Sequence, residues 1–234
     1  MQRIILIETS TALCSVALAE DGNITAYRES SAPKAHASLT SVFIDEMLKE
    51  RGITLADCDA ICVSKGPGSY TGLRVGVSTA KGLCFGSGKP LLAVGTLDTL
   101  VAQATAERLT VIPDLIGDPL HIIPMIDARR MEVYTAVFEN GKQITETVPV
   151  IVDETSFSEY LDKGSCLFIG DGAGKCADVI KHPNAHFLQC WPKASAMLNP
   201  ALDAYKEERF EDVAYFEPFY LKEFVATVSK KKLW

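Results

Sequence analysis

The sequence predicts an α/β fold made of two similar halves, each with the element order β-β-β-α-β-α. The first observation is that short apolar runs, typical of strands, alternate with segments of helical periodicity. The second is that the pattern of the first half returns 119 residues later, where Glu8 falls on Asp127 and Asp21-Gly22 falls on Asn140-Gly141. We therefore expect two sheets with helices alongside and a cleft between them.

The composition is that of an ordinary globular protein in which acidic residues outnumber basic ones. The 234 residues are 47% hydrophobic and 23% charged, and the formal net charge is −7. Because phosphate contacts depend on lysine and arginine, we do not expect the chain alone to bind tRNA tightly. The seven cysteines are odd in number and several lie in apolar runs, which indicates reduced thiols. Without a signal-peptide layout or an apolar run of membrane-spanning length, we expect a cytoplasmic chain without membrane contact.

The first half contains the strands of one sheet and three helices. A continuous apolar run at its start is typical of a buried central strand, and Asp21-Gly22 is a hairpin turn signal. One helix ends before Gly52, a second begins near Gly72, and a third is capped by Thr96. The expected strands are residues 4–7, 15–19, 24–28, 60–63 and 91–94.

A loop at residues 66–74, with the sequence GPGSYTGLR, joins a strand to the central helix of the first half. Ser69 or Thr71 can cap this helix, which we expect over residues 72–85. Its apolar face consists of Leu73, Val77, Ala80 and Cys84, and a nearly bare stripe consists of Gly72, Gly76 and Thr79, with Gly82 and Gly86 further along the helix. An interior glycine costs a helix about 1 kcal/mol relative to alanine. The bare stripe therefore predicts a close contact, either with the sheet of the same chain or with a helix of another chain.

A punctuated segment separates the two halves, because Pro113, Gly117 and Pro119 interrupt the periodicity. We expect a first lobe of residues 1–106 and a second of residues 107–217, with a tail at 218–234 that packs back on the body. The second half contains a glycine-rich loop at 170–174. Its other expected elements are a short helix at 157–161, a strand at 167–169, a helix starting within 176–180, a strand at 186–190 and a helix at 194–206.

Four motifs carry a family resemblance. They are Ile7-Glu8-Thr9-Ser10, His36 ahead of the first helix, the GPGSYTGLR loop and Ala80-Lys81-Gly82-Leu83. With these motifs the chain resembles the TsaB (YeaZ) family, the dimerisation subunit of the bacterial machinery for threonylcarbamoyladenosine in tRNA. The resemblance implies the ribonuclease H-like fold shared by actin, Hsp70 and sugar kinases. It also implies a complex with the catalytic paralogue TsaD and the ATPase TsaE, which modifies the adenosine next to the anticodon, so that tRNA is contacted only through the complex.

The resemblance predicts neither a metal site nor a catalytic residue in this chain. TsaD-like proteins carry a His-x-x-x-His pair after the fifth strand, and the matching positions here are Thr96 and Leu100, which cannot replace imidazole ligands. His182 and His186 have Pro183 between them, so they cannot share a helical face as a ligand pair. We therefore expect no bound metal and no catalysis by the chain alone.

The nucleotide site that the fold implies departs from the pattern of actin-like ATPases. Those proteins place an aspartate and a glycine-containing turn at the end of the first strand, where this chain has Glu8-Thr9-Ser10-Thr11. We expect a vestigial site that holds no nucleotide tightly in the isolated chain, with ATP or ADP and Mg²⁺ binding only within the complex. Its candidate residues are Glu8, Thr9, Ser10, Asp127, Arg129, Gly170, Asp171, Gly172 and Gly174.

The resemblance also implies a docking face, formed by the helices at 36–50 and 72–85, for TsaD or for a second copy of the chain when TsaD is absent. Its candidate residues are His36, Leu39, Phe43, Met47, Gly72, Arg74, Gly76, Thr79 and Leu83. The expected function is that of a non-catalytic partner subunit in tRNA threonylcarbamoylation. One alternative is an autonomous ATP-dependent kinase or ATPase of the same fold, and another is a glycoprotease-like peptidase.

Overall fold

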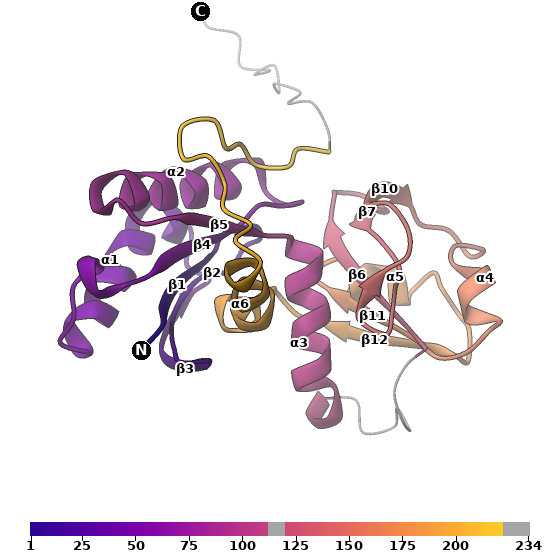
Figure 1. Cartoon of the computed structure of the whole chain (residues 1–234). Helices are drawn as coiled ribbons and strands as arrows, with labels where there is room; N and C mark the ends of the chain where they lie inside the picture. The colour runs from indigo at the N-terminus through magenta and orange to yellow at the C-terminus, as the bar shows by residue number, and fades with distance from the viewer. Residues whose placement is uncertain (112–119, 222–234) are drawn as a thin grey trace, which may run out of the picture.

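The computed structural model describes residues 1–111 and 120–221, with the backbone alone for 107–111, and contains two sheets with helices alongside (Figure 1). The strand order is β3-β2-β1-β4-β5 in the first sheet and β10-β7-β6-β11-β12 in the second. The two orders correspond strand for strand. In both sheets the first strand runs antiparallel to the second and parallel to the fourth. This repeated topology confirms the predicted duplicated α/β fold of the ribonuclease H-like class.

The centre of the first sheet is β1, whose residues from Ile4 to Glu8 are all buried. The turn after β2 places Asp21 and Gly22 at φ values of 46° and 77°, in the left-handed region that a tight hairpin requires. Because β1, β4 and β5 are parallel, the loops that follow β1 and β4 leave the sheet at the same edge. The strands are β1 (Arg3–Glu8), β2 (Cys14–Glu20), β3 (Asn23–Ser30), β4 (Ala60–Ser64) and β5 (Leu91–Val94).

The second sheet repeats this plan, except that two of its strands are split. The pair β7 and β8 takes the place of the second strand, and the pair β9 and β10 takes that of the third. As expected from the repeat, β6 ends at Asp127, and Asn140-Gly141 forms a tight turn, here between β8 and β9. The interruption is held by hydrogen bonds of 2.8 Å from Val137 N to Thr145 Oγ1 and from Ile144 N to the Val137 carbonyl. The strands are β6 (His121–Asp127), β7 (Glu132–Thr135), β8 (Phe138–Glu139), β9 (Lys142–Gln143), β10 (Val148–Ile151), β11 (Cys166–Gly170) and β12 (Ala185–Gln189).

Helices cover both faces of the first sheet. On one face lie α1 (Ala35–Glu50) and α2 (Tyr70–Ser87), the short 3-10 turn η1 (Leu55–Asp57) lying nearby. The predicted apolar face of α2 is confirmed, since Leu73, Val77, Ala80 and Cys84 are all buried. The opposite face is covered by the 3-10 turn η2 (Ala194–Met197) and by α6 (Leu198–Lys206), which together occupy the span predicted as one helix.

The two lobes exchange helices. Although α3 (Thr96–Val111) follows the first sheet in the chain, it packs on the second sheet through its apolar face. Conversely, α6 follows the second sheet but packs on the first. The predicted division into residues 1–106 and 107–217 therefore does not follow the packing. The physical reason is that the apolar face of a sheet must be buried by a helix. Here one face of each sheet is buried by a helix from the other half of the chain.

The smaller helices complete the second lobe. The helix expected within 157–161 is α4 (Ser158–Leu161). The next helix was expected to start within 176–180, but α5 runs over Ala173–Ala177 and so starts directly after the glycine-rich loop. Over the part of the chain that the structure describes, no helix is long and apolar enough to cross a membrane.

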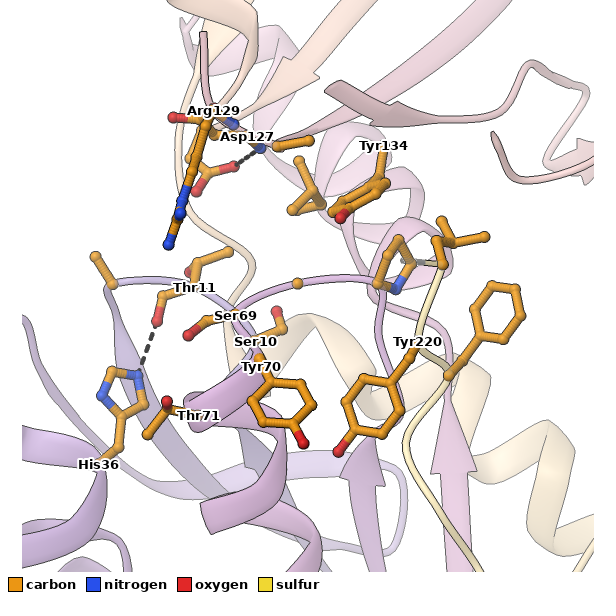
Figure 2. Close-up of a pocket in the computed structure, with 18 residues that line it drawn as sticks. Ser10, Thr11, His36, Ser69, Tyr70, Thr71, Asp127, Arg129, Tyr134 and Tyr220 are labelled. Atoms are coloured by element: carbon orange, nitrogen blue, oxygen red, sulfur yellow. Dashed lines mark hydrogen bonds between the residues drawn. The ribbon is translucent and has the colours of Figure 1, made fainter. Parts of the chain in front are cut away.

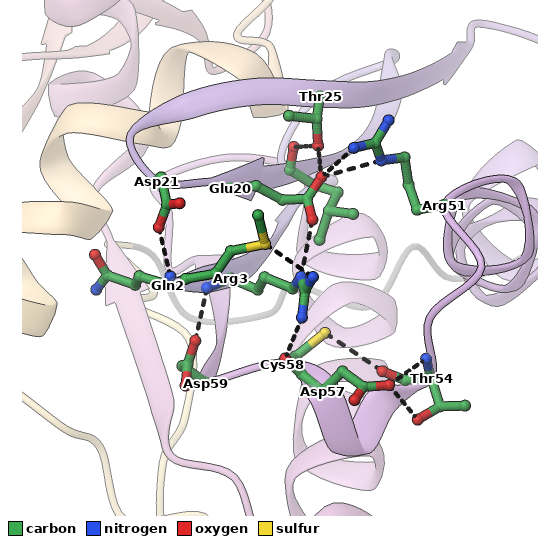
Figure 3. Close-up of polar contacts among 12 residues, drawn as sticks. Gln2, Arg3, Glu20, Asp21, Thr25, Arg51, Thr54, Asp57, Cys58 and Asp59 are labelled. Carbon is green, nitrogen blue, oxygen red and sulfur yellow. Dashed lines mark hydrogen bonds and ion pairs between the residues drawn. The ribbon is translucent and has the colours of Figure 1, made fainter.

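A polar cluster closes the first sheet at the edge opposite the loops after β1 and β4 (Figure 3). Its centre is the buried carboxylate of Glu20, which accepts hydrogen bonds from Arg3 Nε at 2.8 Å and from Thr25 Oγ1 at 2.7 Å. The Arg51 guanidinium lies 2.9 Å from the same carboxylate. The neighbouring Asp59 accepts a hydrogen bond of 2.6 Å from the backbone N–H of Arg3. The cluster ties β1 to β2, β3 and the end of α1.

The C-terminal segment of the described chain returns to the first lobe. The backbone N–H of Phe219 donates to the Lys65 carbonyl at 2.7 Å. The Lys81 ammonium on α2 donates to the carbonyls of Ala214 and Phe216 at 3.0 and 3.1 Å. Residues 207–221 therefore cross α2 (Figure 1). The rest of the predicted tail, including Lys230–Lys232, lies outside the described residues.

Candidate functional site

A cleft of about 710 Å³ lies between the two lobes (Figure 2). It forms where the loops after β1, β4 and β6 meet, because each lobe places its first strand at the centre of its sheet. The C-terminal segment closes one side, with the Tyr220 ring 4.9 Å from the Tyr70 ring. The lining residues include Ser10, Thr11, Ala12, His36, Pro67, Gly68, Ser69, Tyr70, Thr71, Asp127, Arg129, Tyr134, Asp171, Phe219 and Tyr220.

The first lobe contributes the N-terminus of α2 and the loop after β1. Of the two predicted caps, Ser69 and Thr71, it is Ser69 that caps α2, since its Oγ accepts a hydrogen bond of 3.3 Å from Gly72 N. The Ser69 backbone N–H in turn donates to the Ser10 carbonyl at 2.6 Å. His36 Nε2 makes a hydrogen bond of 2.8 Å with the Thr11 carbonyl. These bonds hold the loop after β1 against the positive end of an 18-residue helix, which favours an anion.

Three hydroxyl groups in this loop, those of Thr9, Ser10 and Thr11, lack a hydrogen-bond partner among the described residues, and two of them line the cleft. The side chains of Ser10 and Thr11 are at least nine-tenths buried, and both line the cleft. Neither Ser10 Oγ nor Thr11 Oγ1 bonds to any group among the residues the structure describes. A buried hydroxyl without a partner costs about 1–3 kcal/mol, so these two atoms suit a polar ligand in the cleft.

The second lobe contributes two carboxylates and a cation. Asp127 accepts a hydrogen bond of 2.5 Å from Lys175 Nζ and one of 2.7 Å from the backbone N–H of Arg129. Asp171 accepts a hydrogen bond of 2.9 Å from Asp127 N, and burial raises the pKa of Asp171 to about 6. The Arg129 side chain extends into the cleft towards Thr11 (Figure 2).

Glu8 and Thr9, both predicted for this site, do not line the cleft. Glu8 is fully buried behind it, where one carboxylate oxygen accepts hydrogen bonds from Ser10 N at 2.7 Å and Ser64 Oγ at 2.9 Å. Burial raises the pKa of Glu8 to about 7. The carboxylate predicted to meet a nucleotide is thus enclosed by its own strand and by β4.

The glycine-rich loop also differs from the expectation. Only Asp171 of the four predicted loop residues lines the cleft. A Cβ atom on Gly170 would overlap the Met125 carbonyl, and one on Gly172 would lie 2.9 Å from the Val133 side chain. A Cβ atom on Gly174 would lie 2.7 Å from Gln189 Oε1. These glycines therefore allow close packing on the lobe's own strands rather than opening a slot for a base.

The arrangement fits an anionic group better than a complete nucleotide. The α2 N-terminus, the partnerless hydroxyls of Ser10 and Thr11, and Arg129 provide donors and positive charge for a phosphate or carboxylate. The residues expected on the adenosine side are packed internally. Among residues 1–111 and 120–221, no three His, Cys, Asp or Glu side chains come together as a metal site.

The helical surface of α1 and α2 contains some, but not all, of the residues predicted for docking. Gly72 and Gly76 are buried, and a Cβ atom on either would overlap Thr9. Met47 is buried in the core of the first lobe, and Phe43 and Leu83 are half-buried against that core. Leu39 and Thr79 are also half-buried. The part of the predicted bare stripe at Gly72 and Gly76 therefore faces its own chain, because the loop after β1 approaches the backbone of α2 there.

The outward face of α2 has a different composition. Phe85 is 87% exposed, and Cβ atoms on Gly82 and Gly86 would meet no atom within 4 Å. Arg74 lies on the same exposed side, with its guanidinium 5.1 Å from the centre of the Tyr70 ring. Sequence reasoning missed Phe85, although its place one residue after Cys84 puts it outside the buried face of the helix.

A family model, curated sequences and a solved structure that are similar to this chain agree with one another. A family model described as "TsaD: tRNA N6-adenosine threonylcarbamoyltransferase" matches residues 28–164. The TsaB protein of Haemophilus influenzae is 37% identical over 98% of this chain and 96% of its own, and that of Escherichia coli is 30% identical over 96% of both. Both are described as tRNA threonylcarbamoyladenosine biosynthesis proteins. A solved Pseudomonas aeruginosa structure, described as similar to peptidase YeaZ, superposes with a TM-score of 0.81 at 26% identity, covering 95% of this chain and all of the other.

Proposed function

Because the chain belongs to the TsaB family of tRNA threonylcarbamoyladenosine biosynthesis proteins, we propose that it acts as a non-catalytic subunit that docks on a TsaD-like transferase. The observation that carries this proposal is the outward face of α2, where the exposed Phe85 lies between Gly82 and Gly86. An exposed aromatic side chain beside bare backbone suits a closely approaching partner helix. A TsaE-like ATPase and tRNA are then reached through the complex, in the cytoplasm.

The same face would pair two copies of this chain when the transferase is absent. A pairing of identical surfaces gives a two-fold symmetric dimer. Since both associations use Phe85 and Gly82, the homodimer and the heterodimer exclude one another. Gly72, Gly76 and Met47 have no part in this revised docking face, because all three are buried.

Two variants of the outward face of α2 test the proposal. Phe85→Ala removes the exposed side chain and should weaken association about tenfold or more. Gly82→Leu should block close approach while leaving the far-ultraviolet circular dichroism unchanged, since the position is open. Light scattering after size exclusion measures the homodimer, and reconstituted tRNA threonylcarbamoylation measures the complex.

Ile151→Ala is the matched control, because Ile151 is also a large, exposed apolar side chain but lies on β10 of the second lobe. It should associate and support modification like the unaltered chain. If Phe85→Ala and Gly82→Leu also do so, this face is not the docking surface. Modification activity in the isolated chain, without any transferase, would contradict the non-catalytic role.

We further propose that the cleft holds ATP or ADP with Mg²⁺ only within the complex. The donors described at Ser10, Thr11 and Arg129 support a phosphate, whereas the internally packed glycines give the base no slot in the isolated chain. Titration calorimetry with Mg-ATP should give no heat of binding with the chain alone. Micromolar binding with turnover by the isolated chain would instead favour an autonomous ATPase of the same fold.

A further inference from the structure

A second, smaller pocket lies in the other lobe, away from both the cleft and α2. It has a volume of about 340 Å³ and is lined by residues of β7, β10 and α4. Its walls are the side chains of Val137, Val148, Val150, Phe157 and Tyr160. A concave, mostly apolar pocket of this size, with a few polar groups, is typical of a small-molecule site.

The buried end of the pocket contains an unused hydroxyl group. Thr135 is 2% exposed, lines the pocket, and has no hydrogen-bond partner for its Oγ1 among the described residues. It is fixed in place because β7 pairs with both β6 and β10 at this residue. A buried hydroxyl without a partner is unfavourable, so a polar ligand atom at this depth would be stabilised by a hydrogen bond to it.

The wall contains a strained aromatic residue. Phe157 has a φ of 66°, in the left-handed region that bulky side chains rarely adopt. Its ring contacts Phe168 edge to face, 5.5 Å between centres. Such strain tends to persist where a binding site needs the side chain in one position. Here it places an aromatic surface against the pocket.

The exposed end of the pocket is acidic. Glu146 and Glu159 both line it, both are exposed, and neither forms an ion pair within the part of the chain that is described. Lys163 lies 5.4 Å from the centre of the Tyr160 ring but does not line the pocket. The exposed end of the pocket therefore favours the cationic group of a ligand, while the walls favour its apolar part.

We propose that this pocket binds a small amine with an apolar body, its ammonium beside Glu146 and Glu159 and a hydrogen-bonding atom at its far end on the Thr135 hydroxyl. Because the two carboxylates are exposed and the Thr135 hydroxyl is buried, such a ligand extends from the exposed to the buried end of the pocket. Tyramine has all three: an ammonium, an aromatic ring and a phenolic hydroxyl. The proposal is independent of the docking function of α2.

The test is a titration of the isotopically labelled full chain, followed by amide chemical shifts, with three probes. Phenethylamine lacks the hydroxyl of tyramine, and 3-(4-hydroxyphenyl)propionate replaces the ammonium with a carboxylate. Tyramine should give saturable shifts at Thr135, Val137 and Val150, with an affinity about fivefold higher than phenethylamine. The carboxylate should bind more weakly still, and Glu146→Gln or Glu159→Gln should reduce the preference for the amine.

Thr135→Val should abolish the difference between tyramine and phenethylamine without lowering the melting temperature, since it removes a partnerless buried hydroxyl. Thr96→Val is the matched control, because Thr96 Oγ1 is also buried and partnerless but lies outside the pocket. It should leave both affinities unchanged. The proposal fails if tyramine gives no saturable shifts at these residues up to about 10 mM, if phenethylamine binds the unaltered chain equally well, or if Thr135→Val keeps the difference.

Discussion

Glu8 and Glu20 are two buried carboxyl groups of the first sheet, and their surroundings shift their pKa values in opposite directions. Glu8 lies behind the cleft and forms no ion pair with the described residues, and desolvation raises its pKa from 4.5 to about 7. Glu20 accepts hydrogen bonds from Arg3 and Thr25 and pairs with Arg51, and these interactions lower its pKa. The same residue type thus weakens the fold at neutral pH in one place and stabilises it in the other.

Glu8→Gln should change the pH dependence of stability. A carboxyl group whose folded pKa is raised contributes fully below its unfolded pKa, and this contribution is lost as pH rises from about 4.5 to about 7. The amide oxygen can still accept from Ser10 N and Ser64 Oγ. Between pH 5 and pH 8 the unaltered chain should therefore lose about 2–3 kcal/mol of unfolding free energy that the variant keeps. Urea unfolding at both pH values measures this, and parallel profiles would contradict the buried, unpaired state of Glu8.

Glu20→Gln should have the opposite signature. A carboxyl group with a lowered folded pKa contributes stability above its unfolded pKa of about 4.5, and this contribution is lost as pH falls through the folded value. The variant should be less stable by about 1 kcal/mol at pH 7, because Arg3 and Arg51 lose their charged partner. The difference should shrink below pH 4. An equal difference at pH 7 and pH 3 in urea unfolding would show that packing, not charge, is responsible.

At the scale of the element, α2 carries glycines of two kinds. Gly72 and Gly76 face the loop after β1, where Thr9 leaves no room for a side chain. Gly82 and Gly86 face outward and meet nothing within 4 Å. One helix therefore uses glycine inwards to position the cleft loop and outwards beside the exposed Phe85.

Alanine substitutions should separate the two kinds of glycine. Gly76→Ala should destabilise the chain by about 1–3 kcal/mol, because the new Cβ overpacks the contact with Thr9. Gly82→Ala should stabilise it by up to about 1 kcal/mol, since alanine is the better helix former and the site is open. Thermal unfolding of both variants is the measurement. Equal effects of the same sign would mean that the orientation of α2 is wrong.

At the scale of the whole molecule, the exchange of α3 and α6 connects the lobes. The apolar face of α6 fills the core beside β1, β4 and β5, and that of α3 fills the core beside β6 and β11. Neither sheet is covered on both faces by its own half of the chain. The lobes should consequently behave as one cooperative unit.

A fragment of residues 1–106 should therefore fail to fold, although it contains the complete first sheet. Without α6, one face of this sheet is exposed, and α3 has no second sheet to cover. Near-ultraviolet circular dichroism and amide dispersion should indicate a loosely packed fragment, whereas the full chain should show one calorimetric transition. Adding residues 107–234 as a second fragment should restore native signals. A well-dispersed spectrum from the fragment alone would contradict this interdependence.

The sequence alone determined the repeat, most strand positions and the buried face of α2, and narrowed the cap of α2 to Ser69 or Thr71, because each depends on local spacing or on one residue type. The motifs also indicated the family correctly. The side of α2 faced by Gly72 and Gly76, the enclosure of Glu8 and the packing of α3 and α6 depended on the tertiary structure. A glycine permits close approach without specifying the neighbour, and a carboxylate at a strand end can face the cleft or the core. These choices are made by segments far apart in the chain, whose contacts local patterns do not encode.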